Sequence, residues 1–196
     1  MSVPKVFGVY GESDSGKTTL IIQLVSRFTQ EGFQVATVKQ TNKAISMDTK
    51  QKDTWRHHQA GAHLVVFSSK SETDFLLDTS LSSAEIVRRI IEFRAVDFIL
   101  IEGADDPDVP KIRVGSGKKR VNTIATYTNN FHEIFCLLKT CKPLESYIPD
   151  LRIHVNGKNI PLTEFPSQII SNTIIGMIGS LKGVQEIHSI ILELKI

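Results

Sequence analysis

The chain has 196 residues, of which 41% are hydrophobic and 22% are charged, and this ordinary balance excludes a disordered chain or a fibrous repeat. Its 23 basic and 21 acidic residues leave a formal net charge of +2, which excludes a broad electrostatic footprint for nucleic acid or a membrane surface. Because no stretch of about 18 apolar residues occurs, we expect a cytoplasmic protein with no membrane partner.

A strand, a glycine-rich loop and a helix follow one another at the N-terminus. The run from Val3 to Tyr10 is β-branched and aromatic and ends at Gly11, which is typical of a strand buried on both faces. From Thr18 to Gln30 apolar residues recur at helical spacing, and Gly32 follows as a terminator. The sequence therefore predicts strand, loop and helix in immediate succession.

The middle of the chain continues this alternation. We expect strands at Phe33 to Val38, His63 to Phe67, Phe75 to Leu77 and Val96 to Ile101, with helices at Lys50 to Ala60 and from Ser82 or Ser83 onward. A short KIRV strand, a solvated loop from Gly115 to Arg120 that holds the only basic cluster, and a core strand from Ile134 to Leu138 follow. The alternation predicts an α/β fold with a mostly parallel sheet covered by helices.

The last part of the chain has a different pattern. In RIHVNGKNIPL, Asn156 and Gly157 supply the positive φ values that a two-residue hairpin turn needs. A helical stretch from Glu164 to Leu181 and a closing strand from Ile190 to Ile196 come after it. We therefore expect two domains: a nucleotide-binding domain over residues 1–145 and a small α+β extension over residues 150–196.

The segment GESDSGKT, from Gly11 to Thr18, satisfies the GxxxxGK[ST] pattern between a predicted strand and a predicted helix. In such a loop, backbone N–H groups and the positive end of the helix dipole surround a triphosphate, and the lysine reaches its β and γ phosphates. The candidate phosphate ligands are Gly11, Glu12, Ser13, Asp14, Ser15, Gly16, Lys17, Thr18 and Thr19. The pattern predicts a three-layer P-loop NTPase fold.

An acidic residue is predicted at the carboxyl end of the strand VDFILIE. Glu102 lies there, and ligands gather at the carboxyl ends of the strands in an open α/β sheet. We expect Thr18 and Glu102 to hold Mg²⁺, the threonine through its hydroxyl and the glutamate through a bound water. Asp105 and Asp106 are alternatives that follow in the next loop.

The polar segment after the second strand offers further candidates. Asp48 and Asp53 are placed to orient a magnesium-bound or attacking water, as in switch-like loops beside a γ phosphate, although spacing alone equally allows idle surface acids. Glu102 and Asp53 are therefore the candidate catalytic residues. No guanine-reading NKxD motif occurs, since Asn42 and Lys43 are followed by Ala44 and Ile45, so chemistry alone does not assign the base.

Four segments together resemble the molybdopterin-guanine dinucleotide biosynthesis protein B family, a set of small phosphate-loop GTP-binding adapters. They are GESDSGKTTL, the strand that ends in Lys39, KDTWRHHQAGA from Lys52 to Ala62, and DFILIEGADDPDVPKIRV from Asp97 to Val114. The resemblance extends to about residue 140, and the NGK hairpin with GMIGSLKG looks like a tail of archaeal-type members. Where the family usually has histidines after the strand-two lysine, this chain reads Gln40 to Lys43.

The resemblance implies binding of GTP with Mg²⁺, slow hydrolysis at most, homodimerisation, and assistance to a partner enzyme that attaches GMP to molybdopterin. Carried over to this chain, Gly11, Gly16, Lys17, Thr18 and Thr19 are phosphate ligands and Glu102 is the residue on the magnesium side. Asp53, Arg56 and Ala60 to Ala62 match a motif that we expect near the γ phosphate or a pterin-binding surface.

Two other functions are compatible with a phosphate loop. A small-molecule kinase needs a lid with arginines and a carboxylate that accepts the substrate proton, and no arginine-rich lid is visible. A nickel or cobalt metallochaperone GTPase needs a cluster of Cys or His ligands, which the two cysteines, Cys136 and Cys141, do not supply. The expectation is therefore a GTP-binding adapter that is at most a weak GTPase.

Overall fold

The computed structural model describes residues 4–142, 151, 153–160, 162, 164–184, 187, 190 and 192. The chain divides into two compact units, one spanning Pro4–Pro143 and the other formed by residues 1–3 and 144–196. The first unit contains the phosphate loop and is described first.

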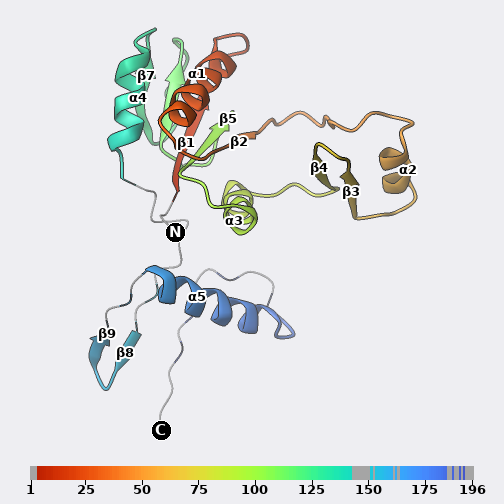
Figure 1. The fold of residues 1–196 in the computed structure, drawn as a ribbon, viewed down its shortest axis with the longest axis vertical. Helices are drawn as coiled ribbons and strands as arrows, with labels where there is room; N and C mark the ends of the chain where they lie inside the picture. Colours follow the sequence, from red (N-terminus) through yellow and green to blue (C-terminus); the bar gives the residue numbers. More distant parts are fainter. Residues whose placement is uncertain are drawn as a thin grey trace. The chain divides into compact units, whose positions relative to one another are not determined.

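A parallel sheet of five strands forms the centre of the first unit, in the order β2-β5-β1-β6-β7 (Figure 1). The strands are β1 (Lys5–Tyr10), β2 (Val35–Lys39), β5 (Phe98–Glu102), β6 (Lys111–Val114) and β7 (Thr123–Tyr127). All four of its strand pairs are parallel, so every carboxyl end lies at one edge. The predicted α/β fold with a mostly parallel sheet is confirmed.

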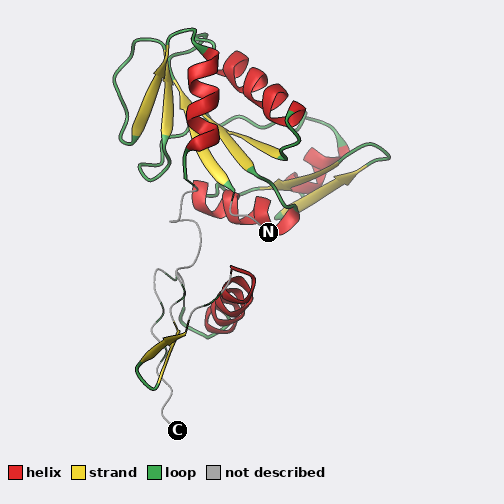
Figure 2. Ribbon diagram, turned by 60° about the vertical axis from the view of Figure 1, so that its left-hand side comes forward, coloured by secondary structure: helices red, strands yellow, loops and turns green. Residues whose placement is uncertain are grey.

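Helices cover both faces of this sheet (Figure 2). On one face lie α1 (Lys17–Gln30), which buries a stripe of apolar residues ending at Phe28, and α4 (Phe131–Thr140). The core on this side includes Phe7, Val9, Phe28, Phe98, Leu100, Ile112, Ile134 and Leu138. The alternate residues Ile99 and Ile101 face the opposite side, where α3 (Ser83–Phe93) buries Val87. The result is the three-layer arrangement.

The C-terminal part of the first unit corrects the sequence prediction. The segment from Ile134 to Leu138 is not a strand but the middle of α4, and the preceding strand β7 was missed. The Asn130 side chain caps α4 by accepting a hydrogen bond from the backbone N–H of Glu133 at 3.3 Å. A short apolar run without clear alternation does not distinguish a buried strand from a buried helix, and in this segment the Asn130 cap favours the helix.

The two middle strands also differ from the expected pattern. β3 (Leu64–Ser68) and β4 (Thr73–Leu77) do not join the central sheet but pair antiparallel with each other as a separate ribbon. One face of the ribbon packs on the short helix α2 (Asp53–Gln59), where Val65 is buried and His58 lies 3.2 Å from the carbonyl of Leu76. α2 is shorter than predicted.

The second unit contains a hairpin and a helix. β8 (Ile153–Val155) and β9 (Lys158–Ile160) are antiparallel, and the turn between them has φ values of 52° at Asn156 and 77° at Gly157, as predicted. α5 (Glu164–Gly179) follows. The closing strand expected at Ile190 to Ile196 lies largely outside the described residues. Among the helices that the structure describes, none has the length and apolarity to cross a membrane.

Candidate functional site

The phosphate loop joins the carboxyl end of β1 to the first residue of α1, and its backbone depends on two glycines. A Cβ at Gly11 would lie 2.3 Å from the carbonyl oxygen of Val114 and 2.7 Å from the Ser15 hydroxyl, so no larger residue fits there. Gly16 has a φ of 94°, in the left-handed region that glycine adopts at little cost. The glycines therefore set the tight curvature that the motif predicts.

The start of α1 has the properties of an anion site. The cap residue Gly16 has no side chain, and the first turn contains no acidic residue, so α1 itself supplies neither a cap nor a negative charge to its N-terminal N–H groups. The hydroxyl of Ser15 is buried and, in the part of the chain described, has no hydrogen-bond partner. The ammonium of Lys17 donates to the carbonyl of Glu12 within the loop. An unpaired hydroxyl, the N–H groups of an uncapped helix start and a lysine form a donor set that suits phosphate.

Three residues from different elements meet beside this loop. The Thr18 hydroxyl donates to both carboxylate oxygens of Glu102, at 3.1 and 3.0 Å. The Lys39 ammonium lies 3.5 Å from one of the same oxygens. A hydroxyl and a carboxylate at a phosphate loop are oxygen ligands of the kind Mg²⁺ prefers. The structure thus brings together the two residues predicted to hold magnesium and adds Lys39, which the sequence analysis named only as the end of a strand and gave no role in the site.

The register of the sheet explains this meeting. Glu102 is level with Val9 of β1 on one side and with Lys39 of β2 on the other. Since alternate residues of a strand point to the same face, Glu102 follows Phe98 and Leu100 toward α1. The signal for Lys39 was present as a lysine at the carboxyl end of a predicted strand, but its neighbour depends on the strand order.

The loop between β6 and β7 supports the phosphate loop from the other side. Arg113 donates to the carbonyls of Ser116 and Gly117, which holds this loop in a compact form. Arg120 bonds the carbonyl of Ala104 at 2.7 Å, and its guanidinium lies 4.9 Å from the ring centre of Tyr10. Arg120 is thus a structural link to the turn after Glu102, although its side chain is exposed, as expected for this basic loop.

Lys111 is the most unusual charged residue of this unit because its side chain is fully buried. Its ammonium donates to the carbonyls of Val109 at 2.8 Å and Val121 at 3.0 Å, which ties together the loops that flank β6. Burial lowers the pKa of Lys111 from the usual 10.5, and the nearby carboxylates of Asp106 and Asp105 oppose that shift. Sequence reasoning missed this residue because a lysine in KIRV has no local sign of burial.

The other acidic candidates lie elsewhere. Asp53 is on α2, where its carboxylate is 3.6 Å from Arg56, and among the described residues no hydrogen bond or ion pair joins it to the phosphate loop. Asp48 accepts a hydrogen bond from Thr54 at 2.8 Å, and Asp105 pairs with Arg120 at 3.5 Å. Glu102 is therefore the acid that the structure places beside Thr18.

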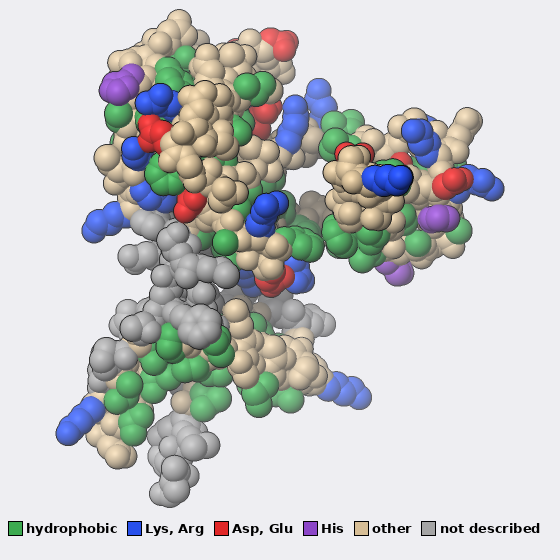
Figure 3. Space-filling model, viewed as in Figure 1, with side chains coloured by type: hydrophobic (Ala, Val, Ile, Leu, Met, Phe, Trp, Pro, Cys, Tyr) green, Lys and Arg blue, Asp and Glu red, His purple; other side chains and the backbone are tan. Residues whose placement is uncertain are grey.

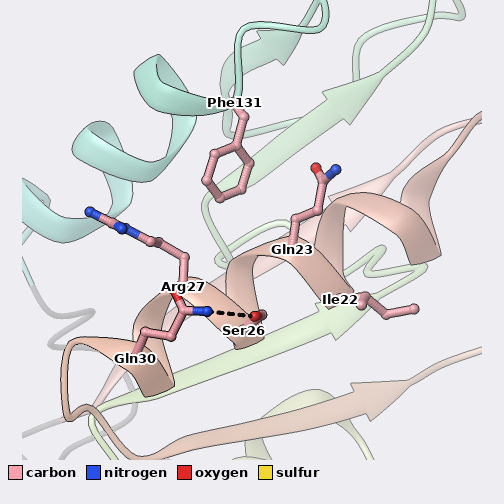
Figure 4. Close-up of a pocket in the computed structure, with 6 residues that line it drawn as sticks. All are labelled: Ile22, Gln23, Ser26, Arg27, Gln30 and Phe131. Atoms are coloured by element: carbon pink, nitrogen blue, oxygen red, sulfur yellow. Dashed lines mark hydrogen bonds between the residues drawn. The ribbon is translucent and has the colours of Figure 1, made fainter.

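A shallow depression of about 450 Å³ lies between α1 and α4 (Figure 4). Its lining residues are Ile22, Gln23, Ser26, Arg27, Gln30 and Phe131. None of them belongs to the phosphate loop or to the Thr18, Glu102 and Lys39 group, so the depression is separate from the candidate site.

A protein-family model described as molybdopterin guanine dinucleotide synthesis protein B (MobB) matches residues 6–137. This stretch contains the phosphate loop, Glu102 and all five strands of the central sheet except the first residue of β1. The chain belongs to the MobB family. The MobB resemblance stated from the sequence is thereby confirmed.

Two relatives support this membership. A Methanocaldococcus jannaschii protein named as a molybdopterin-guanine dinucleotide biosynthesis adapter is 26% identical over 234 residues, with 98% of each chain covered. The adapter protein of Haemophilus influenzae is 27% identical over 108 residues, which cover 55% of this chain and 61% of that protein. The likeness to the first relative thus includes the C-terminal unit.

Solved MobB structures share the fold. The Bacillus subtilis MobB structure has a TM-score of 0.52 and 26% sequence identity, covering 63% of this chain and 78% of that one. A MobB homologue from Bacillus stearothermophilus has a TM-score of 0.51 at 19% identity, covering 69% and 99%. These values place the first unit in the same P-loop NTPase-like α/β fold.

Proposed function

We propose that this MobB protein binds GTP with Mg²⁺ and assists the enzyme that attaches GMP to molybdopterin. The observation that carries the proposal is the Thr18 hydroxyl bound to Glu102 at the N-terminus of α1, beside an uncapped phosphate loop. The donors of the loop suit the phosphates, and the two oxygen ligands suit the cation. Guanine as the base is inferred from the adapter relatives, whose names concern a guanine dinucleotide.

The expected role is that of an adapter with slow hydrolysis at most, working in the cytoplasm. Fast hydrolysis needs an arginine or equivalent charge at the transferred phosphate. Here Arg56 pairs with Asp53 on α2, and Arg113 is engaged by two carbonyls of its own loop. Glu102 remains the candidate for ordering an attacking water, and Asp53 remains a candidate for a surface that meets the terminal phosphate or a pterin.

A homodimer is part of the proposal, and the β3–β4 ribbon is the surface that supports it. Leu64, Val66, Phe75 and Leu77 are opposite one another in register on the face away from α2, and each side chain is about half exposed, between 48% and 50%. Figure 3 shows hydrophobic side chains grouped on this part of the molecule. A contiguous apolar face on a two-stranded ribbon is typical of a surface that associates with another chain.

A titration separates this function from the alternatives. GTP and ATP are titrated separately into the full chain, with Mg²⁺ and with a chelator, and we expect tight binding only for GTP with Mg²⁺. Co-purification with the guanylyltransferase then tests the adapter role, with the Lys17→Ala variant as control. Equal affinity for the two nucleotides, or a product phosphorylated from a metabolite panel, would contradict the proposal.

A further inference from the structure

The backbone next to Lys39 is held in place by several contacts, although the side chain of Lys39 is mostly in solvent. It ends β2 opposite Glu102, and the next residue, Gln40, donates its backbone N–H to the carbonyl of Glu102 at 2.9 Å. A Cβ on Gly103 would lie 2.4 Å from the carbonyl oxygen of Gln40, so the two turns are in close contact. The Gln40 amide also donates to the Ser83 hydroxyl of α3 at 3.1 Å. The backbone that follows Lys39 is therefore anchored to the end of β5 and to α3.

The side chain of Lys39 contrasts with this fixed backbone. It is 72% exposed, whereas the Glu102 side chain that it contacts is only 14% exposed. The ammonium thus reaches in from solvent to a mostly buried carboxylate, at a distance of 3.5 Å. Solvent screens the exposed ammonium of this pair, and the long flexible stem of the lysine allows the ammonium to change partner without moving the backbone.

The groups that face Glu102 define what happens when a cation arrives. In the part of the chain described, the side chains in contact with its carboxylate are the Thr18 hydroxyl and the Lys39 ammonium. A divalent cation held by Thr18 and Glu102 would take over the negative charge of the carboxylate and repel the ammonium. A triphosphate held at the phosphate loop would bring its terminal phosphate toward this cation, and that phosphate would offer the ammonium a new anionic partner.

We propose that Lys39 is a terminal-phosphate ligand that exchanges Glu102 for the γ phosphate when the magnesium triphosphate binds. This inference rests on the proposed function. It makes Lys39 the residue that discriminates a triphosphate from a diphosphate, because a diphosphate leaves no anion beside the cation on the β2 side. Lys17 serves both ligands, since it belongs to the loop that surrounds the β phosphate.

The test measures the affinities of the full chain for GTP and GDP, each with Mg²⁺, by calorimetry. Lys39→Met is compared with the wild type, with Lys39→Arg, which keeps the charge, and with Lys43→Met as a control. Lys43 is also exposed, and its ammonium has no ion pair among the described residues. Loss of one charged hydrogen bond predicts about a 10- to 100-fold weaker affinity for GTP in Lys39→Met, with GDP affinity within about twofold.

The outcomes are distinguishable. We expect Lys39→Arg to keep most of the GTP affinity and Lys43→Met to match the wild type. If Lys39→Met weakens GTP and GDP equally, Lys39 only orders Glu102, and if it weakens neither, the pair is an idle surface contact; either result overturns the inference. Failure of the wild type to bind GTP at all would instead refute the proposed function. The unfolding midpoint of each unliganded variant confirms that it is folded.

Discussion

The Thr18 hydroxyl donates to both oxygens of the Glu102 carboxylate, at 3.1 and 3.0 Å, and so joins the first turn of α1 to the carboxyl end of β5. The two residues are 84 positions apart in the sequence. Because the hydroxyl belongs to the phosphate loop and the carboxylate is mostly buried, the contact links phosphate binding to cation binding in one place. This relationship leads to the first prediction.

Replacing Glu102 by glutamine keeps the shape of the side chain and a hydrogen-bond acceptor for Thr18, but removes the charge that attracts a cation. We expect the affinity for GTP with Mg²⁺ to fall at least about tenfold, as is common when a group that orders a metal site is lost. The affinity in a chelator should stay nearly the same. Glu92→Gln is the control, since Glu92 pairs with Arg89 on the outside of α3. An equal loss with and without Mg²⁺ would rule out the cation role.

Lys17→Ala removes the ammonium of the phosphate loop. Truncating a charged partner of a polyanion costs at least about 100-fold in affinity, so triphosphate binding should become undetectable by calorimetry. Among the residues that the structure describes, this ammonium donates to the Glu12 carbonyl of its own loop and to no other group, so the unfolding midpoint should hardly change. Lys43→Ala is the matched control. A Lys17→Ala protein that still binds GTP would remove Lys17 from the site.

The phosphate loop and Glu102 were predictable because each depends on local sequence. The GxxxxGK[ST] spacing fixes a strand, a loop and a helix together, and the apolar run before Glu102 places it at a strand end. Lys39 and Lys111 were not predictable in the same way. The partner of Lys39 lies on β5 and is decided by the strand order, and the partners of Lys111 are carbonyls of the loops before and after β6, whose path the local sequence does not give.

The ribbon shows why strand pairing escaped the sequence analysis. The chain reverses between β3 and β4 without glycine, asparagine or proline, because the Ser69 hydroxyl accepts hydrogen bonds from the backbone N–H groups of Ser71 and Glu72. Serine forms such turns only weakly and is common in all loops, so it gives no clear hairpin signal. The two strands therefore looked like further members of the parallel sheet.

A charged substitution on the exposed apolar face of the β3–β4 ribbon should change the oligomeric state of the protein. Val66→Asp places a charge on the apolar face formed with Leu64, Phe75 and Leu77, and we expect the proposed dimer to dissociate to monomers at micromolar concentration. Ile22→Asp is the control, because Ile22 is 63% exposed but lies on α1. Sedimentation velocity reads the result. If Val66→Asp stays dimeric, the ribbon is not the interface.

Gly11→Ala tests the tight packing behind the phosphate loop. The added methyl group would meet the carbonyl of Val114 at 2.3 Å, so the loop or the end of β6 must shift. We expect a loss of stability of about 1–3 kcal/mol, as for other overpacked sites, together with weaker GTP binding. Gly176→Ala in α5 is the control, because its added Cβ meets nothing within 4 Å and alanine favours a helix. Urea unfolding and calorimetry measure the two effects, and a stable, fully binding Gly11→Ala protein would contradict the geometry.

Lys111 predicts a pH dependence of stability whose sign follows from its burial. Its pKa is lowered in the folded state, so between that value and the usual 10.5 the unfolded chain binds more protons than the folded one. The free energy of unfolding contributed by Lys111 therefore rises with pH across this window and is flat below it.

Urea unfolding of the wild type and of Lys111→Met over a pH series up to 10.5 isolates this contribution as a difference. The free energy of unfolding of the wild type should increase relative to that of the variant as the pH rises. The reason is that the neutral amine still donates hydrogen bonds to the carbonyls of Val109 and Val121 without the penalty of a buried charge. A difference that shrinks with rising pH would mean that the folded state stabilises the charged ammonium.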